Sequence, residues 1–83
     1  MTRSYRITEV ARMLGEKPHV LRYWEQEFRI HTTRSTRGQR VYSEHEVARL
    51  SYVRQLLRVE LFTIAGAKRQ LAAYVAERRS HAG

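Results

Sequence analysis

The sequence contains no cysteine and no aspartate, and proline occurs only once. Without cysteine, neither a disulfide nor a thiolate metal ligand is available, so packing must stabilise the fold. No apolar run is long enough to cross a membrane, and the first fifteen residues lack the uninterrupted apolar segment of a secretory signal. These absences favour a cytoplasmic protein with no membrane partner.

Residue patterns typical of catalysis are also scarce. The four histidines, His19, His31, His45 and His81, are scattered without the spacing of metal ligands, and there is no glycine-rich phosphate loop. His45 stands between two glutamates and is better explained as part of a helix start. We therefore expect no enzyme activity, no metal site and no cofactor.

Positive charge is abundant by contrast. Sixteen lysines and arginines against eight acidic residues give the 83-residue chain a net charge of +8, and fourteen of the sixteen are arginine. The planar arginine fork can bind a phosphate or the edge of guanine through two hydrogen bonds. A polyanion is the expected partner, and solubility is the plainer alternative. The length suits one domain with a single small core.

The first half of the chain predicts two short helices. Residues 5–7 have the pattern of a strand-like entry, Thr8 is placed to cap a first helix, and Gly15 to end it in a left-handed conformation. Pro18 suits the first turn of a second helix. The apolar residues of that helix recur at helical spacing and are Val20 or Leu21, Trp24 and Phe28. Two such helices around a glycine are typical of a helix-turn-helix, whose second helix enters the major groove.

Residues 29–42 predict a β-hairpin. Threonine, serine and arginine replace the helical pattern, and Thr36, Arg37 and Gly38 have the composition of a turn. The segment carries four arginines and no acidic residue, so its positive charge has no local compensation. A short basic hairpin directly after a helix-turn-helix is the order of parts in a winged helix.

The second half predicts two further helices. Ser43 and Glu46 have the spacing of a capping box at the start of a third helix, whose apolar stripe is Val47, Leu50, Val53 and Leu57. A break is expected at residues 59–62. Thr63 then caps a fourth helix, whose inward residues are Ile64, Ala67, Leu71 and Tyr74 or Val75. Residues 80–83 are expected to be a frayed tail.

Several separate motifs resemble the MerR-type winged-helix DNA-binding domain of bacterial transcriptional regulators. They are Ile7-Thr8-Glu9-Val10-Ala11, Leu14-Gly15, Leu21-Arg22-Tyr23-Trp24-Glu25, Gly38-Gln39-Arg40-Val41-Tyr42 and Thr63-Ile64-Ala65-Gly66-Ala67. The resemblance implies a mainly α-helical fold with a small hairpin, a winged helix-turn-helix of four helices and one wing, over residues 1–79. The second helix would then be the recognition helix, the hairpin the first wing, and the junction of the last two helices a second wing.

Ten residues are expected to contact double-stranded DNA. They divide between helix starts and the recognition helix (Thr8, Lys17, His19, Arg22 and Tyr23) and the wing (Arg34, Arg37, Gln39, Arg40 and Tyr42). Tyr42 is an expected phosphate contact through the resemblance, but a tyrosine that closes the hairpin against the core is the alternative. Trp24 belongs to the apolar stripe and is expected in the core.

The chain departs from the family pattern at two positions. Glu16 stands where a small apolar residue usually follows the turn glycine, and Leu61 stands where glycine usually ends the third helix. The long dimerising helix and the effector domain of a typical regulator are absent, so we expect a monomeric module from a protein that binds DNA as a homodimer. The alternatives are an excisionase-like architectural DNA-binding protein and a basic module bound by an acidic partner. RNA binding is less favoured because no stacking pair on a sheet is evident.

Overall fold

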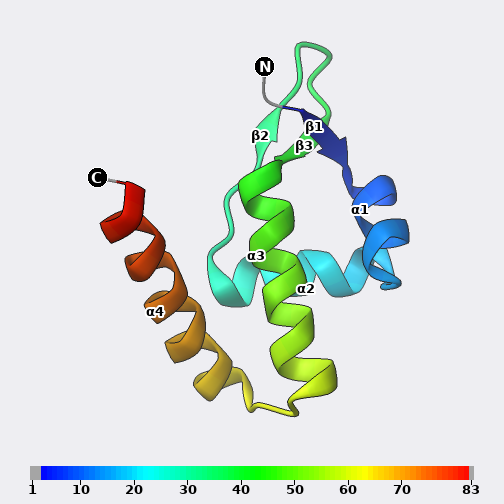
Figure 1. Cartoon of the computed structure of the whole chain (residues 1–83). Coiled ribbons are helices and arrows are strands. Elements are labelled where there is room, and N and C mark those ends of the chain that lie inside the picture. Colours follow the sequence, from blue (N-terminus) through cyan, green and yellow to red (C-terminus); the bar gives the residue numbers. More distant parts are fainter. Residues whose placement is uncertain (1–2, 83) are drawn as a thin grey trace. The chain divides into compact units, whose positions relative to one another are not determined.

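The computed structural model describes residues 3–82 and has the predicted mainly helical fold with a small antiparallel hairpin. The order of elements along the chain (Figure 1) is β1 (Ser4–Arg6), α1 (Ile7–Leu14), α2 (Pro18–Phe28), β2 (Thr33–Arg34), β3 (Arg40–Ser43), α3 (Glu44–Arg54), the π-helical segment η1 (Gln55–Val59) and α4 (Ile64–Ala82).

Packing divides the chain into two compact units, Met1–Ser51 and Tyr52–Gly83, with the boundary inside α3. Buried apolar residues occur in both units. The first unit buries Val10, Ala11, Leu21, Trp24, Phe28, Ile30, Val41, Tyr42 and Leu50, and the second buries Val53, Leu56, Ala67 and Leu71. The helix-turn-helix and the hairpin both belong to the first unit.

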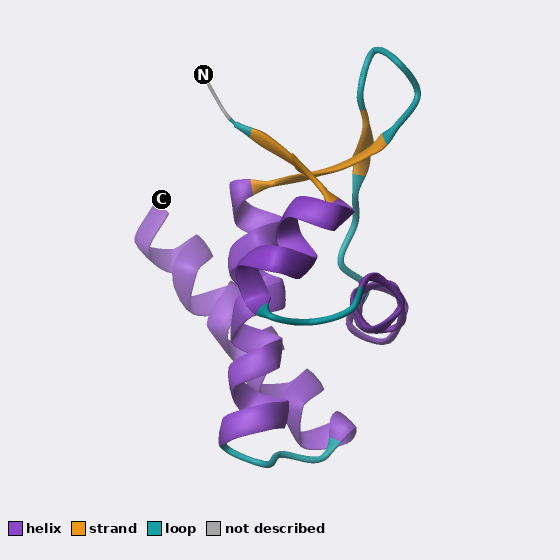
Figure 2. Ribbon diagram, turned by 90° about the vertical axis from the view of Figure 1, so that its right-hand side faces the viewer, coloured by secondary structure: helices purple, strands orange, loops and turns teal. Residues whose placement is uncertain are grey.

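The three strands of the first unit form one antiparallel sheet in the order β1-β3-β2. Tyr5 pairs with Tyr42, and Thr33 pairs with Val41, so β3 is the central strand. The loop between β2 and β3 extends beyond the sheet and away from α1 and α2 (Figure 2). The hairpin was predicted, but the pairing of the entry strand with β3 was not.

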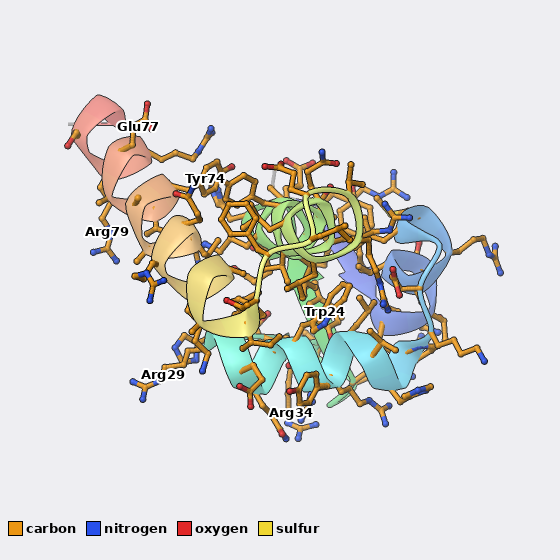
Figure 3. The ribbon with its side chains drawn as sticks, turned by 90° about the horizontal axis from the view of Figure 1, so that it is seen from below. Trp24, Arg29, Arg34, Tyr74, Glu77 and Arg79 are labelled. Atoms are coloured by element: carbon orange, nitrogen blue, oxygen red, sulfur yellow. The ribbon has the colours of Figure 1, made fainter. Side chains whose placement is uncertain are left out.

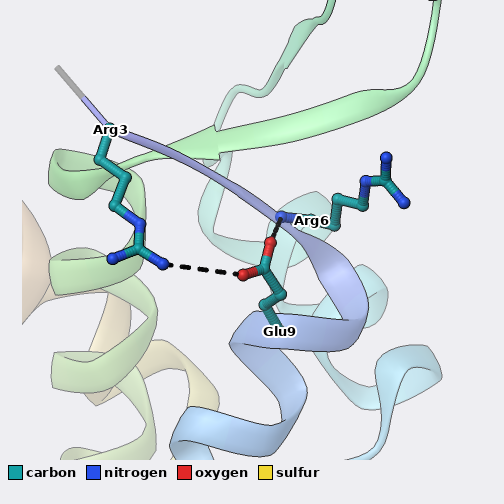
Figure 4. Close-up of polar contacts among 3 residues, drawn as sticks. All are labelled: Arg3, Arg6 and Glu9. Carbon is teal, nitrogen blue, oxygen red and sulfur yellow. Dashed lines mark hydrogen bonds and ion pairs between the residues drawn. The ribbon is translucent and has the colours of Figure 1, made fainter.

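The start of α1 differs from the prediction. Thr8 was expected to cap this helix, but α1 begins at Ile7 and Arg6 is its cap residue. The carboxylate of Glu9 accepts a hydrogen bond of 3.0 Å from the Arg6 backbone N–H and pairs with the Arg3 guanidinium at 4.0 Å (Figure 4). Because Glu9 supplies the acceptor that an orphan N–H needs, no cap hydroxyl is required. The prediction of the Thr8 cap was therefore wrong, and Thr8 is exposed in the first turn.

The turn of the helix-turn-helix forms as predicted. Gly15 ends α1 with a left-handed φ of 66°, and the N–H of Glu16 donates to the carbonyl of Ala11 at 3.0 Å. Pro18 lies in the first turn of α2, where its missing N–H leaves no bond unmade. Glu16 is only partly exposed and does not prevent the turn.

The predicted capping box at the start of α3 and the predicted cap of α4 are also present. The Ser43 N–H donates to Glu46 at 3.0 Å and the Glu46 N–H to Ser43 Oγ at 3.3 Å, while the Gly66 N–H donates to Thr63 Oγ1 at 3.0 Å. In the second unit, Tyr52 stacks on Tyr74 with ring centroids 4.6 Å apart.

Two details of the second unit correct the prediction. Leu56 is buried and Leu57 only half-buried, in the segment η1 that packs against α4. The predicted frayed tail is helical as far as Ala82, and Gly83 lies outside the described residues. Leu61 adopts a left-handed φ of 58° at the predicted break and is 78% exposed. The resemblance led us to expect glycine at this turn, and leucine adopts the left-handed conformation here.

Candidate nucleic-acid interface

Helix α2 has one buried and one exposed side. Leu21, Trp24 and Phe28 are buried. They are spaced three and four residues apart, which places them on one face of the helix. His19, Arg22, Tyr23 and Gln26 are exposed. In Figure 3, Trp24 points from α2 toward the interior, whereas Arg29 and Arg34 point away from the ribbon. The burial of Trp24 confirms its predicted place in the core.

The wing is a tight hairpin fixed by its own hydrogen bonds. The Gly38 N–H donates to the Ser35 carbonyl at 2.9 Å, and the Ser35 N–H donates to the Gln39 carbonyl at 2.7 Å. Gly38 has a φ of 78°, so the loop is a turn closed by a left-handed residue, which glycine adopts without steric cost. The predicted turn at Thr36, Arg37 and Gly38 is confirmed.

Side chains of the wing reinforce this turn. Ser35 Oγ accepts hydrogen bonds from the Arg37 N–H at 3.3 Å and the Gln39 N–H at 3.2 Å. Arg34 donates from Nη1 to the Gly38 carbonyl at 2.9 Å. Hydrogen bonds within the turn therefore fix the backbone at Arg37, the exposed residue at the tip of the wing.

A buried carboxylate joins α2 to the wing. Glu25 is 8% exposed and accepts a hydrogen bond on Oε2 from the Tyr42 hydroxyl. Its Oε1 lies 3.6 Å from Arg40 Nη1. Arg40 and Tyr42 are two residues apart on β3, and residues with this spacing lie on the same face of a strand. Helix α2 and the wing thus meet at Glu25.

The charges around this contact act on the tyrosine. Burial, followed by the hydrogen bond to Glu25, raises the pKa of Tyr42 above its ordinary value, while the positive charges of Arg40 and Arg22 oppose the shift. Tyr42 therefore stays protonated and donates to Glu25.

The structure exposes nine of the ten residues predicted to contact DNA. Thr8 and Lys17 lie at the N-terminal ends of α1 and α2, and the other seven exposed residues lie on α2 and on the wing, namely His19, Arg22, Tyr23, Arg34, Arg37, Gln39 and Arg40. Tyr42 is the exception, because its side chain is fully buried and its hydroxyl is bonded to Glu25. Its placement is the alternative that the sequence left open, a tyrosine that closes the hairpin against the core.

Glu25 was not singled out from the sequence, although a signal was present. Leu21, Trp24, Glu25 and Phe28 stand at positions i, i+3, i+4 and i+7, so the carboxylate occupies a position of the apolar stripe. An acidic residue at such a position is rarely buried unless it is paired. A buried partner for Glu25 could have been inferred from this spacing, but the identity of Tyr42 and Arg40 could not.

Among the described residues, no group of three His, Cys, Asp or Glu side chains is placed to hold a metal ion. Within residues 3–82 there is also no helix with the length and apolar character needed to cross a membrane.

The arrangement of helix-turn-helix and wing agrees with a comparison against known families. Residues 5–74 match the family described as MerR HTH family regulatory protein, which covers both helices of the helix-turn-helix, the wing, α3 and most of α4. No curated protein is significantly similar to the sequence. Since the family match spans most of the chain and the predicted elements are in place, the chain belongs to the MerR family of helix-turn-helix regulatory proteins.

Proposed function

We propose that the chain binds double-stranded DNA in a sequence-specific manner, as the DNA-binding module of a bacterial transcriptional regulator. The observation that carries the proposal is the junction at buried Glu25, which holds α2 beside a wing that carries three exposed arginines. A helix that enters the major groove and a basic hairpin beside it are the two parts that a winged helix needs.

The exposed residues divide by chemistry. Arg37 and Arg40 of the wing, with Arg34 and Gln39 beside them, neutralise phosphates and fix the register of the protein on the duplex. On α2, His19 and Arg22 lie in the N-terminal half of the helix, the part that meets base edges in a helix-turn-helix. A guanidinium can bind the O6 and N7 atoms of guanine together, which makes Arg22 the stronger candidate for base recognition.

Titration of the domain with duplex DNA at several salt concentrations tests this function. If about four to six phosphates are neutralised, the slope of log K against log salt should be roughly −4 to −5. Amide shifts should concentrate in residues 17–28 and 34–42. A flat salt response would contradict the proposal, and shifts confined elsewhere would favour recognition by an acidic protein partner.

Sequence preference requires a separate measurement. Selection of bound sites from random duplexes should enrich one short motif, because direct contacts to base edges discriminate between sequences by about 1–3 kcal/mol per base. Equal retention of all sequences, together with bending of the duplex, would instead favour an architectural role like that of an excisionase.

The intact regulator is proposed to act as a homodimer. A two-fold operator needs two recognition helices about one helical turn of DNA apart, and the described residues supply one such helix. The domain is therefore expected to engage one half-site. Sedimentation of the domain with a half-site duplex should give a complex of one protein per duplex.

A further inference from the structure

The carboxylate of Glu25 is buried beside the wing, whose exposed charged residues Arg34, Arg37 and Arg40 are all positive. Its side chain is bonded to Tyr42 and paired with Arg40, and it lies three residues after Arg22 on α2. Burial of a charge is costly, and replacing a buried pair with apolar groups is often neutral or stabilising. Stability alone therefore gives no reason for an acid at this position.

The two oxygens of Glu25 have separate tasks. Oε2 accepts from the Tyr42 hydroxyl, which is fully buried, so the carboxylate is fixed to the core on that side. Oε1 faces Arg40 at 3.6 Å, and the Arg40 side chain remains 47% exposed. Glu25 is thus anchored on its buried side by Tyr42 and paired on its exposed side with the guanidinium of Arg40.

An arginine can serve two acceptors at once. The guanidinium has five N–H donors in one plane, and the contact with Glu25 occupies the Nη1 corner of Arg40. The remaining donors can reach a phosphate while the pair with Glu25 persists. A lysine at this position would have a single ammonium group and no planar fork.

From this geometry we infer that Glu25 is a positioning residue for DNA binding, a buried acid that strengthens binding of a polyanion by fixing Arg40 of the wing beside the recognition helix. The inference rests on the proposed function. Glu25 itself does not contact DNA in this proposal. Its carboxylate acts by orienting the side chain of Arg40. Loss of the negative charge at Glu25 should therefore weaken DNA binding, whereas general electrostatics would predict stronger binding.

The test is a double-mutant cycle between Glu25→Gln and Arg40→Ala, read by fluorescence anisotropy with a labelled mixed-sequence duplex. Such a duplex is suitable because phosphate contacts do not depend on sequence. Glu25→Gln raises the net charge by one, yet it should weaken binding about tenfold when Arg40 is present, and it should change binding less than about twofold in the Arg40→Ala background.

Tyr42→Phe is the matched control for a purely structural effect. It removes the hydroxyl that donates to Glu25 Oε2 but leaves Oε1 to pair with Arg40. It should therefore lower the thermal midpoint and, because the carboxylate is held less firmly, weaken binding by up to about threefold, which is less than the tenfold loss expected of Glu25→Gln. All variants are compared at a temperature at which circular dichroism shows them to be folded.

The outcomes separate this inference from the proposed function. Absence of salt-dependent binding by the unmodified domain would overturn both. Three results would overturn the inference while leaving DNA binding intact. The first is that Glu25→Gln weakens binding equally with and without Arg40, and the second is that Glu25→Gln binds DNA more tightly. The third is that Tyr42→Phe loses as much affinity as Glu25→Gln.

Discussion

Replacement of Arg37 by alanine tests the wing as a phosphate clamp. Arg37 is exposed at the tip of a turn in which Ser35 accepts hydrogen bonds from the backbone N–H groups of Arg37 and Gly38. The side chain of Arg37 is not needed for these bonds, so the substitution should leave the fold unchanged. One phosphate contact contributes about 0.9 to the slope of log K against log salt, so a slope of roughly −4 to −5 should become about −3 to −4. Between 1 M and 0.1 M salt, one such contact raises the affinity for DNA about eightfold, which corresponds to about 1.2 kcal/mol.

The matched control is Arg79→Ala, which removes the same charge from an exposed position of α4, far along the chain from the wing. Both variants change the net charge from +8 to +7, so a general charge effect would lower the slope equally. Anisotropy titrations at four or more salt concentrations give the slopes directly. If Arg37→Ala and Arg79→Ala have indistinguishable slopes, the wing does not contact the backbone through Arg37.

Three further predictions concern base recognition, strain and pH. Arg22→Ala or His19→Ala should cost about 1–3 kcal/mol on a selected site and less on mixed sequence, and equal losses on both probes would argue against base contacts. In denaturant titrations Leu61→Gly should be about 1 kcal/mol more stable than Leu61→Ala, because only glycine removes the cost of the left-handed φ of 58°, and equal stabilities would exclude this strain. Since the pKa of Tyr42 is raised above 10.0 in the folded state, the free energy of unfolding should fall as the pH rises above about 10, and Tyr42→Phe should remove this part of the alkaline loss.

The elements of the fold could be predicted because local signals agreed with one another. Gly15, Pro18 and the capping box of Ser43 and Glu46 act within a few residues of their own positions, and each has the conformation that the sequence predicted. The wing turn at Gly38 is of the same kind. Where backbone geometry is decided by near neighbours, a single sequence is sufficient.

The errors arose where partners compete or where packing decides. Thr8 is a good cap residue, but Glu9 provides the acceptor for Arg6 and moves the start of α1 to Ile7. The stripe of the third helix was extended through Leu57 on the assumption of one buried face. Leu56 is buried instead, in the segment η1 that packs against α4, and only the tertiary arrangement determines this.

The candidate site shows the same limit more clearly. Exposed arginines could be predicted from the charge of the sequence. The carboxylate that pairs with Arg40 could not, because Glu25 is held by Tyr42, which lies seventeen residues away in the sequence. Glu25 and Tyr42 are each unremarkable in isolation, and their pairing requires the register of β3 against α2. If buried Glu25 directs Arg40, then DNA affinity in this domain depends on a residue of the wrong charge for a DNA-binding surface. A search for contacts among basic residues would therefore miss part of the binding determinant, and the acidic residues of an apolar helix stripe need to be examined with them.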